Sequence, residues 1–330
     1  MKKTIFLMSS GELKRKDNTL FFETDEKRKY IPVEDTQEIM VFGELTFNKD
    51  LLEFLSQNEI IMHFFNYYGY YTGSYYPREH LNSGLMILMQ AQHYLEQAKR
   101  MELARAFVKG AVANMLKVLG YYSRRQVELS AIMDNIESLC PKIDDTQSTD
   151  ELIGIEGNIR EYYYRAFDNI IGDPEFAFES RSRRPPQNRI NALISLANSM
   201  VYTTALSEIY KTHLDPRIGF LHTTNFRRFS LNLDIAEIFK PIIADRLIFT
   251  LLNKKMITPN DFEDGTQGIL LKEKGRNTFL QQFDEKMKTT VKYQSLNREV
   301  SYRLLIRLEL YKIEKHLLGE KNYEPFVASW

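Results

Sequence analysis

The sequence changes character at Pro77, and this change constrains the fold more than any other feature. Before it, short β-rich segments alternate with turn residues. From about Leu85 onward, apolar residues recur with helical periodicity over long segments that prolines interrupt. The chain is therefore predicted to be α+β, with a small N-terminal β-sandwich-like domain over 1–84 and a larger all-α domain over 85–330.

The predicted strands of the first domain cover residues 3–8, 12–16, 19–23, 29–32, 38–42 and 60–65. A helix is predicted over 48–57, with Asn48 as its N-cap and Leu51, Leu52 and Leu55 facing inward. Residues 66–76, NYYGYYTGSYY, are rich in tyrosine. They form either a stacking or interface surface, or an aromatic strand pair with a glycine turn, and strand propensity favours the second reading.

The second domain is predicted to contain helices over 86–119, 124–139, 149–171, 188–213, 232–253, 273–292 and 295–318. Asp150 can cap the third of these helices, and Pro241 should bend or interrupt the fifth.

Composition excludes several classes of protein. The 44 basic and 44 acidic residues balance, so binding to a polyanion must come from local patches. The single cysteine, Cys140, excludes an intramolecular disulfide and favours a reducing compartment, so a cytoplasmic location is predicted. The apolar run of MKKTIFLM ends at Ser9, too early for a signal peptide, and no membrane-spanning segment is predicted.

The stretch from 219 to 249 carries the strongest candidate for chemistry. His222 precedes a predicted helix that begins with Asp234 and Glu237, and their i, i+3 spacing places both carboxylates on one face. The apolar residues of this helix take the buried side, so the two acids are expected on a rim. The alternative is that the acids only complement the helix dipole and that the histidine is structural.

Two further groups of residues lie before this stretch. Glu156 lies in an apolar part of the predicted helix 149–171, where a carboxylate is costly unless it is paired or binds a metal. Arg160, one turn on, is the alternative partner as an ion pair. A phosphate-contacting surface, or else a solvated loop, is predicted at five arginines: Arg181, Arg183, Arg184, Arg227 and Arg228.

Five blocks occur in an order and spacing that resembles one known family. They read GIEGNIREYYYRAF, RSRRPPQNRINALISLANSM, DPRIGFLH, FSLNLDIAEIFKPIIADRLI and YEPF. They are similar to the CRISPR-associated DNA endonuclease and integrase of spacer acquisition, and the similarity covers essentially the whole helical domain.

The resemblance implies a metal site for Mn²⁺ or Mg²⁺ formed by Glu156, His222 and Glu237, with Asp234 as an additional catalytic acid. Many relatives have Asp where this chain has Glu237, and the extra methylene shifts that carboxylate. The resemblance also implies a homodimer paired through the strand-rich domain. The implied partners are DNA, both protospacer and CRISPR repeat, and the small second CRISPR-associated adaptation protein.

Three functions are therefore compared. The resemblance implies antiviral defence through metal-dependent insertion of new spacers into a CRISPR array, by transesterification at phosphodiesters. A plain metal-dependent nuclease would use the same ligands without a dimer or a partner protein. A non-enzymatic helical scaffold that binds nucleic acid would hold these residues for structural reasons only.

Overall fold

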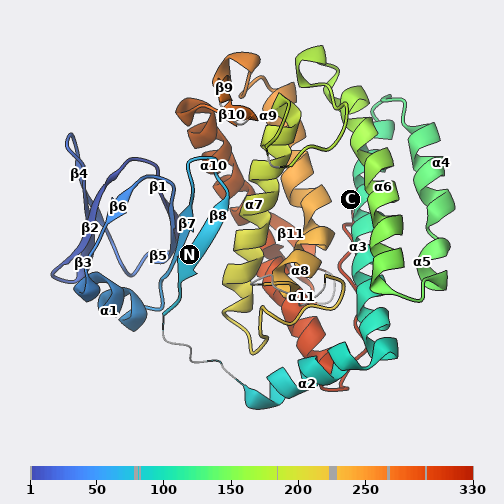
Figure 1. Ribbon diagram of the computed structural model, residues 1–330, viewed down its shortest axis with the longest axis horizontal. Coiled ribbons are helices and arrows are strands. Elements are labelled where there is room, and N and C mark those ends of the chain that lie inside the picture. Colours follow the sequence, from blue (N-terminus) through green and yellow to red (C-terminus); the bar gives the residue numbers. More distant parts are fainter. Residues whose placement is uncertain are drawn as a thin grey trace. The chain divides into compact units, whose positions relative to one another are not determined.

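The computed structural model describes residues 2–77, 81, 83–183, 185–222, 229–265, 268–293 and 296–329. It divides the chain into two compact units, Met1–His80 and Leu81–Trp330. Each unit has its own secondary structure (Figure 1).

The first unit contains two four-stranded sheets. One has the order β1-β5-β7-β8 and is parallel except for its last pair, and the other has the order β4-β3-β2-β6. The strands are β1 (Lys3–Leu7), β2 (Gly11–Lys16), β3 (Thr19–Glu23), β4 (Arg28–Ile31), β5 (Thr36–Val41), β6 (Leu45–Thr46), β7 (Ile61–Phe65) and β8 (Tyr71–Tyr75).

Both sheets and helix α1 (Lys49–Gln57) contribute to one core. Leu13 and Leu20 come from one sheet, Ile39 and Met62 from the other, and Leu51 from the helix. As predicted, Asn48 caps α1, and its side chain accepts a hydrogen bond from the backbone N–H of Leu51 at 3.0 Å. The apolar residues of both sheets and of α1 are thus buried against one another in this shared core.

The tyrosine-rich segment forms a turn and strand β8, which pairs antiparallel with the preceding strand β7. Its turn is closed by Asn66, whose side chain accepts from the N–H groups of Tyr68 at 3.1 Å and Tyr70 at 2.9 Å. Gly69 has a φ of 77°, a conformation that costs glycine little. The predicted glycine turn and one strand are therefore found in this segment, and the partner strand is the one that precedes it.

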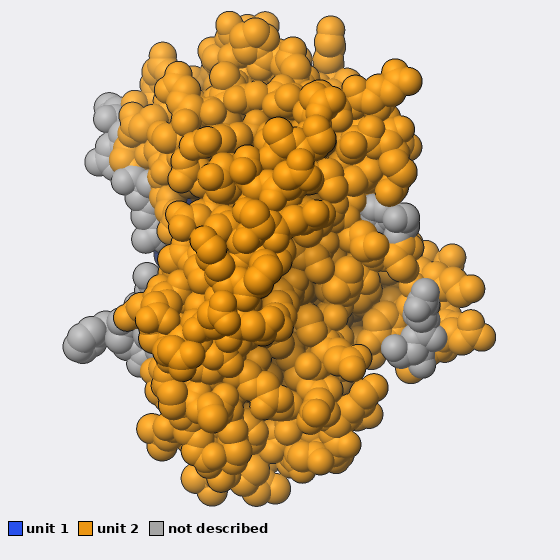
Figure 2. Space-filling model, turned by 90° about the vertical axis from the view of Figure 1, so that its right-hand side faces the viewer, with its two compact units in different colours: residues 1–80 blue, residues 81–330 orange. Residues whose placement is uncertain are grey.

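The second unit, orange in Figure 2, is mostly helical. Its α-helices are α2 (Gly84–Leu95), α3 (Gln97–Ser123), α4 (Ser130–Leu139), α5 (Lys142–Asp145), α6 (Thr149–Ile171), α7 (Arg189–Ile209), α8 (Leu231–Lys240), α9 (Arg246–Asn253), α10 (Glu273–Lys288) and α11 (Tyr302–Leu317). Short 3₁₀ turns are η1 (Pro174–Phe176) and η3 (Pro259–Asp261). None of the helices in the described ranges is long and apolar enough to cross a bilayer.

Helix α8 lies between α3 and α7 in the middle of this unit (Figure 1). Nearly every residue of α7 and α8 is buried, so this is the centre of the core. Pro241 interrupts the helix as predicted, because it opens a π-helical turn, η2 (Pro241–Asp245), before α9 continues.

The α+β class is confirmed, but the second unit is not all-α. It contains two short antiparallel pairs, β9 (Phe262–Gly265) with β10 (Gly268–Leu271) and β11 (Thr290–Tyr293) with β12 (Arg298–Ser301). The predicted helix 86–119 is divided at Glu96 into α2 and α3. Ser148, and not Asp150, caps α6, because its side chain accepts from the N–H of Glu151.

Candidate active site

Asp234 organises the first half of the site from the first turn of α8. Its completely buried carboxylate accepts backbone N–H groups from three consecutive residues, Phe220 at 2.6 Å, Leu221 at 3.1 Å and His222 at 2.9 Å. A Cβ on Gly219 would lie 2.8 Å from the same carboxylate, so this loop can approach only with glycine there. The loop before His222 is therefore folded around Asp234.

The same carboxylate holds the His222 ring, whose Nδ1 lies 2.8 Å from Asp234 Oδ1. An ionised carboxylate only accepts, so Nδ1 carries the proton and Nε2 is the nitrogen left for a ligand. Burial alone would lower the pKa of His222. The hydrogen bond and charge of Asp234, aided by the charge of Glu237, outweigh burial and raise that pKa above its ordinary value.

Glu156 and Glu237 form the second half of the site and share one cation. Arg160 on α6 donates from Nε to Glu156, one turn earlier, and from Nη2 to Glu237 on α8. Lys240 donates to the other oxygen of Glu237. The ion pair of Glu156 with Arg160, an alternative at the level of sequence, is thus present, but it extends to a second carboxylate.

Both acids of α8 are buried, so their expected position on a rim is wrong. The side chains of Asp234 and Glu237 are 0% and 6% exposed. Burial would raise the pKa of Glu237, but the charges of Arg160 and Lys240 lower it to about 2. Each of the two buried carboxylates has its own partners, which come from other segments for Asp234 and from α6 and α8 for Glu237.

A third buried acid, Asp245, lies at the end of the π-turn and was not found by sequence reasoning. Burial raises the pKa of Asp245 to about 7, against the opposing charges of Arg160 and Lys240. Its oxygens and the hydroxyl of Tyr163 have no well-formed hydrogen bond within the described residues. The π-turn after Pro241, predictable only as a bend, is what turns Asp245 inward.

Asp245→Asn is expected to stabilise the protein at pH 8 and to have little effect at pH 4. Between the ordinary pKa of 3.8 and the folded value of about 7, the folded state keeps a proton that the unfolded chain loses, so stability falls as pH rises. Asparagine does not titrate, so the variant avoids this decrease in the free energy of unfolding, which is on the order of 2–4 kcal/mol. Urea unfolding at both pH values measures the effect, and exposed Asp134→Asn is the control. An equal change at both pH values would contradict the assignment.

The arginines proposed to bind DNA are only partly described. Arg181 is directed into its own unit, where it donates to Asn191 Oδ1 at 2.8 Å and to Ser195 Oγ at 3.1 Å. Arg183 is exposed. Arg184, Arg227 and Arg228 lie outside the described residues. DNA binding by these arginines stays a prediction.

The four predicted site residues are therefore placed as two connected pairs, His222 with Asp234 and Glu156 with Glu237 through Arg160. Across the described part of the chain, no three His, Cys, Asp or Glu side chains are grouped so as to hold a metal ion. Lys240 was missed as a site residue, although it follows Glu237 by three positions and so shares its helix face.

Comparison with known proteins identifies the class and then the family. The family model described as CRISPR associated protein Cas1 matches residues 5–285. A CRISPR-associated endonuclease Cas1 of Thermodesulfovibrio yellowstonii is 62% identical over 330 residues, covering 100% of both chains. The Cas1 endonuclease of Thermotoga maritima is 50% identical over 320 residues, covering 97% of this chain and 98% of that one. The chain is thus a CRISPR-associated protein, and it belongs to the Cas1 family.

Solved structures agree with the assignment to the Cas1 family. A Cas1 protein from Thermotoga maritima superposes with a TM-score of 0.89 at 48% identity, covering 98% of this chain and 100% of that one. A casposase bound to its integration product gives 0.87 at 21% identity, with 98% and 93% covered. A chain of a Cas6-RT-Cas1–Cas2 complex gives 0.85 at 17% identity, with 100% and 36% covered. The last two likenesses concern the fold alone.

Proposed function

We propose that this protein is a metal-dependent DNA endonuclease and integrase that inserts new spacers into a CRISPR array. Its Cas1 relatives are named endonucleases, which supports cleavage of DNA. The observation that carries the proposal is that Glu156 and Glu237, from two different helices, face one shared cation beside a histidine held by Asp234.

The donor set fits Mn²⁺ or Mg²⁺. Two carboxylates and one imidazole nitrogen suit these ions, and the nitrogen favours Mn²⁺. The guanidinium of Arg160 contacts both Glu156 and Glu237. The two carboxylates therefore already bind one positive charge between them, which supports the fit. Glu156, Glu237 and Nε2 of His222 would hold the ion, which would supply Lewis-acid stabilisation of a phosphoryl oxygen.

Other side chains of the protein would orient the histidine and supply positive charge. Asp234 fixes the orientation and tautomer of His222, as the outer partner of a ligating histidine does. Lys240, which pairs with Glu237, would supply positive charge near the phosphate. In strand transfer, the 3′-oxygen of the spacer forms a new bond to a repeat phosphorus. The bond from that phosphorus to the repeat 3′-oxygen breaks, and this oxygen takes up the proton that the attacking hydroxyl gave up.

The same proposal gives the N-terminal unit an assembly role. This unit, whose two sheets contribute to one core, would pair two protomers into a homodimer. The occurrence of a similarly folded chain in a Cas1–Cas2 complex supports Cas2 as the small partner protein.

Cleavage and strand transfer by the purified protein test the proposal. Manganese-dependent cutting of branched DNA that a chelator removes is expected, as is insertion of a spacer into a repeat in the presence of the partner. Cleavage without strand transfer would leave a plain nuclease. Activity in neither assay would leave a nucleic-acid-binding scaffold.

Asp234→Asn is expected to weaken Mn²⁺ binding about 10- to 100-fold and to move its pH dependence downward. A ligating imidazole must be neutral. Asp234 helps to raise the pKa of His222, so in the wild type protons compete with the metal to a higher pH than in the variant. Calorimetry at pH 6, 7 and 8 measures both effects. An unchanged pH profile would show that Asp234 does not control the histidine.

A further inference from the structure

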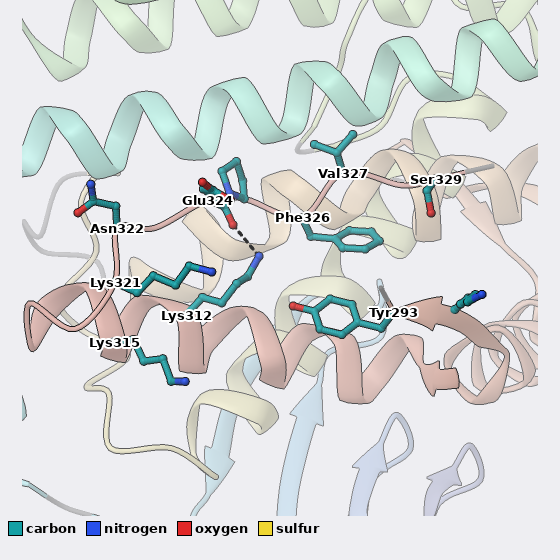
Figure 3. A pocket seen from close by; sticks show the side chains of 11 residues that line it. Tyr293, Lys312, Lys315, Lys321, Asn322, Glu324, Phe326, Val327 and Ser329 are labelled. Atoms are coloured by element: carbon teal, nitrogen blue, oxygen red, sulfur yellow. Dashed lines mark hydrogen bonds between the residues drawn. The ribbon is translucent and has the colours of Figure 1, made fainter. Parts of the chain in front are cut away.

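A pocket of about 200 Å³ lies between α11, β11 and the C-terminal segment, and the proposed chemistry does not use it (Figure 3). Four lysines line it, Lys292, Lys312, Lys315 and Lys321, against one acidic lining residue, Glu324. The pocket is thus locally cationic in a chain whose net charge is zero. We call it the lysine pocket.

Three of these ammonium groups have no partner among the residues that the structure describes. Lys312 is paired, because its Nζ lies 2.6 Å from Glu309 Oε2 and donates to the carbonyl oxygen of Glu324 at 2.6 Å. Within the described residues, the side chains of Lys292, Lys315 and Lys321 form no ion pair or hydrogen bond. Their charges are therefore available to an anion from outside.

The C-terminal wall of the pocket is fixed by buried hydrogen bonds. Glu309, fully buried on α11, accepts from the hydroxyl of Tyr323 at 2.6 Å and from the N–H of Phe326 at 2.9 Å. Asn114 on α3 donates to the carbonyl of Phe326 and accepts from the N–H of Ala328, both at 2.9 Å. The pocket is therefore preformed, and a ligand need not order this segment to bind.

Aromatic rings complete the lining and connect it to the site helix. Tyr293 and Phe326 lie nearly parallel, with ring centroids 6.5 Å apart, and both are half-buried (Figure 3). Phe326 also stacks on Phe239 of α8, with centroids 6.1 Å apart. The pocket is thus built against the helix that carries Asp234 and Glu237.

We infer that the lysine pocket binds a phosphodiester of a single-stranded nucleic acid, with an unpaired base against Tyr293 and Phe326. The volume is below the usual 300–1,000 Å³ of small-molecule sites, so it suits one charged group of a longer ligand. Lysines supply phosphate contacts, and aromatic rings accept unpaired bases of any sequence. The inference rests on the proposed function for its substrate, but the binding it describes needs no metal.

The test uses the full-length protein with Lys315→Gln and Lys321→Gln combined. Its matched control is Lys254→Gln with Lys274→Gln, which removes the same charge from exposed lysines of the same unit. Fluorescence anisotropy with a labelled oligothymidylate, in chelator, measures affinity from low to high salt. The salt slope of log K is expected to fall by about 1.4 in the pocket variant, at about 0.7 per phosphate contact on single strands, and to stay unchanged in the control.

A further variant and a competition measurement identify the ligand. Tyr293→Leu is expected to weaken oligothymidylate binding roughly 5- to 100-fold through lost stacking, with the helical circular dichroism unchanged. Inorganic phosphate should compete only at far higher concentration than the oligonucleotide. Unchanged affinity and slope in the lysine variant, or tighter binding of inorganic phosphate than of the strand, would overturn the inference. A failure of the proposed function gives a different result. The wild-type protein would then show no manganese-dependent cleavage, whereas the lysine pocket is tested by binding in chelator.

Discussion

Glu237→Gln is expected to abolish manganese-dependent cleavage and to lower the free energy of unfolding of the metal-free protein by about 3–5 kcal/mol. The buried carboxylate balances two buried cations, Arg160 and Lys240. Glutamine has the same shape but cannot neutralise them, and it is a poor ligand for a hard cation. This is the largest combined effect on activity and stability that a single isosteric change should produce here.

The pH dependence of stability gives an independent readout. The folded pKa of Glu237 is about 2, below its ordinary 4.5, so its contribution is present above about pH 4.5 and is lost as pH falls toward 2. That difference corresponds to about 3 kcal/mol, which Glu237→Gln should remove. Exposed Glu161→Gln on α6 is the control and should change stability by less than about 1 kcal/mol. If Glu237→Gln keeps metal binding while Asp234→Asn loses it, the proposed roles of the two acids are reversed.

Local signals were enough to place most elements of the fold. The cap at Asn48, the short strands before Pro77 and the break at Pro241 each depend on residues close in sequence, and each is found in the structure. The two short hairpins of the helical unit were missed. Strands of four residues flanked by helical periodicity carry too little pattern to be separated from helix ends.

The surroundings of the candidate site depend on contacts between distant segments. The i, i+3 relation of Asp234 and Glu237 was readable from the sequence, but their burial was not. Their partners are the backbone N–H groups of 220–222 for the first acid and Arg160, from a helix 77 residues earlier, for the second. A carboxylate expected at the surface is thus buried because donors arrive from elsewhere in the fold.

The lysine pocket illustrates the same limit. Its lysines are spread between residues 292 and 321 among many other charges, and no local run distinguishes them from a solvated face. Only the fixed course of the C-terminal segment over α11 brings them together (Figure 3).

Arg160→Gln is expected to destabilise the metal-free protein by about 3–5 kcal/mol and to enlarge the stabilisation that Mn²⁺ provides. Arg160 is buried and holds Glu156 and Glu237 together, while its Nη1 has no hydrogen-bond partner within the described residues. A metal ion bound by these two carboxylates would have to displace the guanidinium. Without Arg160 the carboxylates repel each other in the metal-free state, and the metal has no internal competitor.

Thermal unfolding at pH 8, with chelator and with saturating Mn²⁺, measures this prediction. A ligand stabilises the folded state in proportion to the logarithm of its affinity, so the metal-induced rise in Tm should be larger in the variant than in the wild type. Arg165→Gln is the matched control, because Arg165 pairs with Glu161 at the same i, i+4 spacing on the same helix but is exposed. It should change neither the stability nor the metal response by more than about 1 kcal/mol. A metal-induced rise that is equal or smaller in Arg160→Gln would mean that Arg160 supports the bound metal and does not compete with it. The guanidinium would then belong to the metal-bound site as a permanent positive group near the phosphate.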